Sequence, residues 1–235
     1  MRKNGPLTQT ASWEYNAVKR LAVSFVFLFF PKLLQIMSQQ DDDIQKSLAS
    51  PGAGLPMVQA FALRQFIFPA YCLTTSWDNA LVAFQAEGQK VLALAGPLTE
   101  ERLQRRVLVK APMGIEDSSR YWSAAMVLEH LIEVGSRIAV GIVELSNEVT
   151  VTVKTDIADL KPVGGKGNEI IEDFRQFLDD YVRIIGEEVG YRRSKSRHPH
   201  PWFGKLNAHQ WMCLGAMHQS IHRKQMERIV AGLER

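Results

Sequence analysis

The sequence predicts an all-α protein organised as a four-helix bundle with crossover connections. Apolar residues recur three and four positions apart in four segments of about 20–28 residues, which is the pattern of helices that bury one face. The links between the first and second segments, and between the second and third, are long. Long links favour crossovers over simple hairpins between neighbouring helices.

The first long helix is predicted to start after Thr75 and to run to about Ala95, with Gly96 and Pro97 ending it. Residues 54–72 are apolar but interrupted by prolines, and they are predicted to include a short helix that packs on the bundle.

The second helix is predicted from Ser118–Ser119 to about Asn147, with His130 on its inward apolar stripe. Residues 149–154 (VTVTVK) alternate, which indicates a short extended stretch or a hairpin arm. The third helix is predicted over residues 168–190.

The fourth helix has the clearest start signal. Asn207 is a typical N-cap, Gln210 can complete a capping box, and Leu206 can contact Trp211 one turn inside. An inward stripe then follows at helical spacing: Trp211, Leu214, His218, Ile221, His222, Gln225 and Ile229. His218 and His222 are four residues apart, so they lie on adjacent turns of one face.

Charge and composition exclude some functions for the body of the chain. The chain has 235 residues, 46% of them apolar and 23% charged, which is typical of a soluble globular protein. Its net charge of +3 is unevenly placed, because residues 1–37 carry +4 and the remainder carries −1. A nearly neutral body has little electrostatic attraction for nucleic acid, so we expect no nucleic-acid partner. Cys72 and Cys213 form no disulfide framework, which favours a reducing, cytoplasmic location.

Residues 1–37 do not resemble part of the fold. Leu21–Phe30 is an apolar run of ten, too short for a bilayer span of about 20 residues. The run resembles a signal peptide, although no A-x-A-like cleavage site follows. We favour translation from Met37, and a membrane anchor or export signal through residues 21–36 stays the alternative. The expected division is therefore a leader and flexible lead-in over 1–54 and the bundle domain over 55–235, with no membrane partner.

The chemistry of the chain centres on its inward histidines. The sequence HQSIH lacks the glutamate of an H-E-x-x-H metalloprotease, and no Walker, G-x-G-x-x-G or G-x-S-x-G motif is present. His130, His218 and His222 remain, and three neutral imidazoles suit Zn²⁺, Ni²⁺ or Fe²⁺ with one position open for water or substrate. A histidine on an apolar face is usually a core residue, so the residues alone leave both interpretations open.

Other candidates are weaker, and no catalytic residue or second-shell carboxylate can be assigned. Trp202 and Phe203 are expected in a pocket wall or in ordinary packing. Four basic residues before the last helix could attract an anionic substrate or form a solvated loop: Arg192, Arg193, Lys195 and Arg197. Three further histidines are expected as capping or surface residues rather than ligands: His198, His200 and His209.

Two sequence blocks resemble the DinB-like superfamily of damage-inducible and related four-helix metalloproteins. They are SAAMVLEHLIEVGSRIA from Ser123 and HPWFGKLNAHQWMCLGAMHQSIHRKQ from His200, the second being the more specific. The resemblance covers roughly Thr74 to the C-terminus, and residues 149–154 have no counterpart in it. It places the family's metal ligands on His130, His218 and His222.

The resemblance implies an up-down-down-up bundle with one divalent metal ion at one end, and often a homodimer. It implies a metal-dependent transferase or hydrolase acting on a small-molecule substrate, with a low-molecular-weight thiol as a cosubstrate in some members. The alternative is a non-catalytic, stress-linked binding or dimerisation bundle whose metal site is structural or vestigial.

Overall fold

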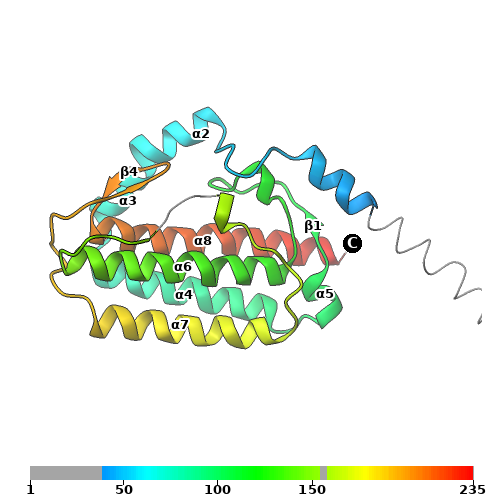
Figure 1. The fold of residues 1–235 in the computed structure, drawn as a ribbon. Helices are drawn as coiled ribbons and strands as arrows, with labels where there is room; N and C mark the ends of the chain where they lie inside the picture. The colour runs from blue at the N-terminus through cyan, green and yellow to red at the C-terminus, as the bar shows by residue number, and fades with distance from the viewer. Residues whose placement is uncertain (1–38, 154–157, 235) are drawn as a thin grey trace, which may run out of the picture. The chain divides into compact units, whose positions relative to one another are not determined.

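The computed structural model describes residues 39–153 and 158–234 (Figure 1). Residues 39–47 form a short helix in a unit that ends at Ser47, and the chain from Leu48 onward forms a second unit. The apolar run Leu21–Phe30 and a start at Met37 lie outside the described residues. Among the helices that are described, none is long and apolar enough to cross a membrane.

The second unit is an all-α four-helix bundle, as the apolar periodicity predicts. Its long helices are α4 (Trp77–Ala95), α6 (Ala124–Ser146), α7 (Glu169–Glu187) and α8 (Ala208–Leu233). Helix α8 packs on α4 and α6, and α7 packs on the other side of α6 (Figure 1).

Residue contacts give the helix directions. From Gly215 to His218, the contacts of α8 move from Ile138 back to His130, so α8 runs antiparallel to α6. From Gly215 to Arg223, its contacts on α4 move forward from Phe84 to Glu87, so those two helices run parallel.

The ends of α6 and α7 complete the topology. The backbone N–H of Gly190, just past α7, donates to Ser146 Oγ at the end of α6, so these two helices also run parallel. The order is therefore up-down-down-up, and the consecutive parallel helices α6 and α7 require a crossover connection.

Side-chain caps begin three of the four long helices. The side chains of Ser76, Ser123 and Asn207 accept backbone hydrogen bonds, and Asn207 forms the predicted capping box with Gln210.

The second long helix starts about five residues later than the sequence predicts. Residues Asp117–Ser119 form a 3-10 turn instead. Strand β2 (Tyr121–Trp122) then pairs antiparallel with β1 (Val107–Leu108). This pairing commits the backbone of Trp122 to a strand, and Ser123 becomes the cap.

Short elements surround the bundle. The expected short helix before α4 is a longer helical segment made of α2 (Met57–Ala62), the π-helical turn η1 (Leu63–Ile67) and α3 (Phe68–Thr74). Helix α5 (Glu100–Gln104) follows α4. Strands β3 (His198–His200) and β4 (Gly204–Leu206) form an antiparallel hairpin before α8.

In the connection between α6 and α7, the described residues do not form the hairpin arm that was one of the two expected alternatives. Residues 149–153 pair with no strand in the described part of the chain, and Lys154 lies outside it. The backbone N–H and hydroxyl of Thr152 instead donate to the Glu144 carboxylate at 3.0 and 2.6 Å. The turn η3 (Ala158–Leu160) follows and contacts α6.

Residues 48–54, part of the expected lead-in, make contacts with the bundle unit. The backbone N–H groups of Gly52 and Gly54 donate to the buried Glu116 carboxylate, and that of Ala49 donates to Asp117.

Candidate metal centre

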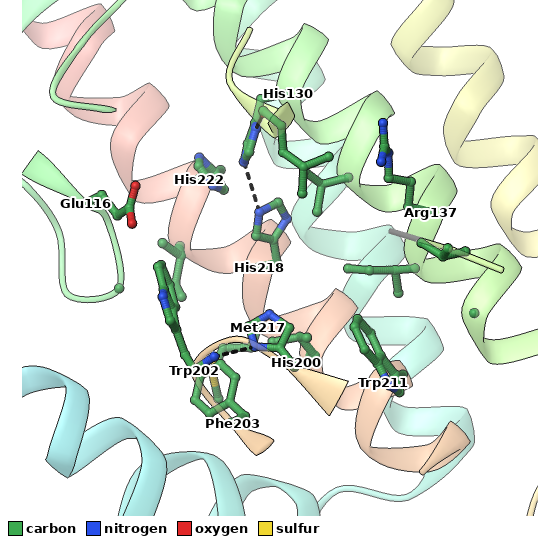
Figure 2. Close-up of a pocket in the computed structure, with 18 of the residues that line it drawn as sticks. Glu116, His130, Arg137, His200, Trp202, Phe203, Trp211, Met217, His218 and His222 are labelled. Carbon is green, nitrogen blue, oxygen red and sulfur yellow. Dashed lines mark hydrogen bonds between the residues drawn. The ribbon is translucent and has the colours of Figure 1, made fainter. Parts of the chain in front are cut away.

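Helices α6 and α8 bring three histidines together where they cross. One ring nitrogen from each of His130, His218 and His222 lies within 4.8 Å of the other two (Figure 2). His130 Nε2 and His218 Nε2 are 3.2 Å apart. Two imidazole nitrogens bound to one tetrahedral zinc ion at 2.0–2.1 Å lie about 3.3 Å apart. The spacing of these two rings therefore fits two ligands of one metal ion.

A backbone carbonyl orients the first ring. His130 Nδ1 lies 2.8 Å from the Leu160 carbonyl oxygen. Because a carbonyl oxygen only accepts, Nδ1 carries the proton and donates it. The lone pair is then on Nε2, the nitrogen that faces His218, and such outer hydrogen bonds fix the tautomer of metal-binding histidines.

A glutamine orients the second ring. Gln225 Nε2 donates to the Ser119 carbonyl at 2.7 Å, which leaves Gln225 Oε1 to accept from His222 Nδ1 at 2.8 Å. Trp122 stacks parallel to the His222 ring, with centroids 5.9 Å apart. The lone pair of His222 is thus also on Nε2. These neutral partners occupy the outer positions for which the sequence provides no carboxylate.

Burial keeps the three imidazoles neutral. Loss of hydration lowers the pKa of His130 to about 4 and holds the pKa values of His218 and His222 well below 6.5. The nearest pair of opposite charges, Lys161 and Glu116, is internally balanced by an ion pair of 2.6 Å. Neutral imidazole is the form that binds a metal ion, so the environment prepares all three side chains for that role.

A cavity of about 130 Å³ opens beside the histidines. Its walls are mainly apolar side chains from α6, α8 and the β3–β4 hairpin (Figure 2). Trp202 and Phe203 are among them, which resolves the two alternatives for these residues in favour of a pocket wall.

His198 and His200 also line this cavity, so their assignment as capping or surface residues is wrong. His200 accepts the Trp202 backbone N–H through Nδ1 at 3.1 Å, and its ring lies 5.1 Å from that of Phe203. Burial lowers the pKa of His200 to about 4. The hairpin that carries these histidines folds over the start of α8, which the local sequence pattern does not show.

The remaining candidates lie away from the cavity. Arg192 forms an ion pair of 2.9 Å with Asp78, and Arg197 donates to the Lys205 carbonyl. Both arginines are exposed and neither lines the cavity, which agrees with the solvated-loop alternative. Arg193 and Lys195 are exposed as well.

His209 lies outside the histidine cluster and makes a contact between two helices. It hydrogen-bonds through Nε2 to the Thr75 carbonyl at 2.9 Å and so joins α8 to the end of α3.

Comparison with known proteins gives a similar solved structure but no family. The chain matches no protein-family model and no curated protein. Among solved structures it is similar to TT2238, described as a four-helix bundle protein, with 25% sequence identity and a TM-score of 0.44. That match covers 65% of this chain and 98% of TT2238.

Proposed function

We propose that this chain is a DinB-like protein that binds one divalent metal ion through His130, His218 and His222. The observation that carries the proposal is the shared orientation of His130 and His222: both donate from Nδ1 to fixed acceptors, which leaves Nε2 for a metal. Zinc, nickel and iron(II) all accept such a ligand set.

We further propose that the metal serves a transfer or hydrolysis reaction on a small molecule, with a low-molecular-weight thiol as the cosubstrate class. Three protein ligands leave a coordination position open, and the cavity beside the histidines has room for a ligand there. When bound, the metal would lower the pKa of a coordinated water or thiol. The surrounding residues hold the ligands neutral and limit access of bulk water.

A non-catalytic role is the second candidate, and one observation favours it. The carboxylate that lines the cavity, Glu116, is already engaged by Lys161 and by the backbone of Gly52 and Gly54. A carboxylate held this way is a poor general base, because its ion pair and hydrogen bonds lower its pKa against the effect of burial. The metal site would then be structural.

The metal content of the untagged full-length chain tests the binding proposal. We expect about one metal ion per chain, and a loss of that metal in His130→Ala and in His218→Ala. His209→Ala is the matched control, because it removes a histidine of the same helix outside the cluster. Full metal content in His218→Ala would contradict the proposal.

Removal of the metal separates the two roles. If chelation unfolds the protein, the site is structural. If the metal-free protein stays folded, and small ligands bind the metal of the loaded protein, the catalytic role is supported. The homodimer and the cytoplasmic location stay predictions, to be measured by sedimentation of the full chain and by fractionation of cells.

A further inference from the structure

The residues that line the cavity beside the histidines follow the seam between α6 and α8. Its lining on α6 extends from His130 to Gly141, and its lining on α8 extends from His222 back to Trp211. The two ends of each stretch are eleven residues apart, or about 16 Å along the helix. Because the two helices are antiparallel, the histidines lie at one end and Gly141 and Trp211 at the other.

Gly141 keeps the far end of the cavity open. It is buried in the interior of α6, yet a Cβ built on it would meet no atom within 4 Å. Gly135 on the same helix contrasts with it, because a Cβ there would lie 2.3 Å from Phe177 Cζ. Gly135 is thus explained by close packing. Gly141 has no such packing reason, although glycine inside a helix is less stable than alanine.

The walls between the two ends are mainly apolar, and the polar rings of His198 and His200 also line the cavity. Val134 and Ile138 line the α6 side, and Leu214 and Met217 line the α8 side. A charged side chain, that of Arg137, also lines this stretch. It forms an ion pair of 2.6 Å with Glu133 on its own helix. A group that extends from the histidines towards Gly141 therefore meets hydrocarbon along most of its length.

The size of the cavity limits the group it can hold. Its volume of about 130 Å³ is close to the roughly 150 Å³ of an apolar protein cavity that binds benzene. Spread along about three helical turns, this volume suits a narrow chain better than a fused ring system. Removal of such a chain from water drives its binding.

We propose that the cavity takes an unbranched alkyl chain whose polar head lies at the three histidines, and that Gly141 sets the longest chain accepted. This inference rests on the proposed metal site and names the substrate class for it. Trp211 forms the opposite wall at the same end.

A series of n-alkyl hydroxamates tests the inference on the metal-loaded full chain, because hydroxamate binds divalent metals and the chain length can be varied. We expect each added methylene to raise affinity by about three- to fourfold until the chain reaches Gly141, after which affinity levels off. Calorimetry measures each dissociation constant. If acetohydroxamate binds and the longer hydroxamates bind with the same affinity, the alkyl inference is overturned and the metal site still stands.

Gly141→Leu supplies the matched substitution. It should weaken the longest hydroxamates at least tenfold and leave acetohydroxamate unchanged. Gly186→Leu is the control, because Gly186 lies in α7, is exposed and outside the cavity, and also has no atom within 4 Å of an ideal Cβ. Equal losses in both variants would overturn the role of Gly141.

A second series separates the chain-binding inference from the proposed function. Linear n-alkyl alcohols need no metal, so their binding reports on the cavity even if hydroxamates fail to bind. Weaker binding of long alcohols by Gly141→Leu than by the wild-type protein supports the inference. Equal binding by the two proteins overturns it. Failure of acetohydroxamate to bind the metal-loaded protein would count against the proposed function instead.

Discussion

The two sides of the bundle differ in how densely their side chains are packed. On the side of α4 and α7, aromatic rings fill the space: Phe84 stacks on Tyr181 with centroids 3.7 Å apart, and Phe174 is fully buried beside Phe177. On the side of α6 and α8, the seam holds polar imidazoles and a cavity. Dense packing stabilises a fold, whereas imperfect packing leaves space for a ligand. The dense packing of α4 and α7 therefore offsets the stability that is lost at the cavity between α6 and α8.

The largest effect should follow from truncation on the densely packed side. Phe174→Ala removes a fully buried ring and should lower the free energy of unfolding by about 3–5 kcal/mol. Leu214→Ala, at the cavity wall, should cost about 2 kcal/mol, because its space merges with an existing cavity. Urea unfolding of the metal-free variants measures both values. Equal losses would show that the two sides are packed alike.

Acid should destabilise the histidine side next most strongly. The folded pKa of His130 is about 4 against 6.5 in an unfolded chain, so the unfolded state takes up the proton first as pH falls. Stability is full above pH 6.5 and declines towards pH 4, by on the order of 3 kcal/mol from this group. His218 and His222 shift in the same direction.

The urea midpoint of the metal-free protein between pH 7.5 and 4 measures this loss. His130→Gln should flatten part of the decline, because glutamine does not titrate. A midpoint that stays constant over this range would contradict the neutral buried histidines.

Loss of the outer hydrogen bond to His222 should have a moderate effect. Gln225→Leu removes the acceptor for His222 Nδ1 and the bond to Ser119, and should weaken metal binding by about 10–100-fold. Competition with a chelator measures the affinity. Gln176→Leu is the control, since Gln176 is exposed on α7. An unchanged affinity in Gln225→Leu would mean that His222 needs no orienting partner.

The smallest effects on stability should come from glycine substitutions, which compare the open cavity end with the densely packed side. Gly141→Ala places a methyl group in open space and should stabilise the protein by about 0.4–1 kcal/mol, as should Gly186→Ala. Gly135→Ala should destabilise it, because Phe177 must move. Thermal unfolding of the three variants gives the comparison, and a destabilising Gly141→Ala would show that the cavity end is already filled.

Local patterns predicted most of the bundle but few of the short elements around it. The spacing of apolar residues and the cap at Asn207 are properties of neighbouring residues, and both predictions are confirmed. The start of the second helix was wrong because Trp122 pairs with Val107, and that pairing depends on a segment fifteen residues away. The β3–β4 hairpin was missed for a related reason, since its short strands show no alternation.

Some features of the candidate site could likewise be predicted from the sequence, and others could not. The inward orientation of His218 and His222 follows from helical spacing alone. The role of His200 depends on how the hairpin packs on α8, and its sequence neighbours give no sign of it. The bond from His130 to Leu160 could not be predicted either, because every residue carries a carbonyl and only the fold selects one.

That carbonyl has a consequence for the evolution and control of the site. No substitution of the Leu160 side chain removes the acceptor, so the orientation of His130 is insulated from mutation at that position. It depends instead on where the η3 turn lies. By thermodynamic linkage, any contact that shifts this turn would change the affinity for the proposed metal, and a bound metal would stabilise the turn by the same free energy.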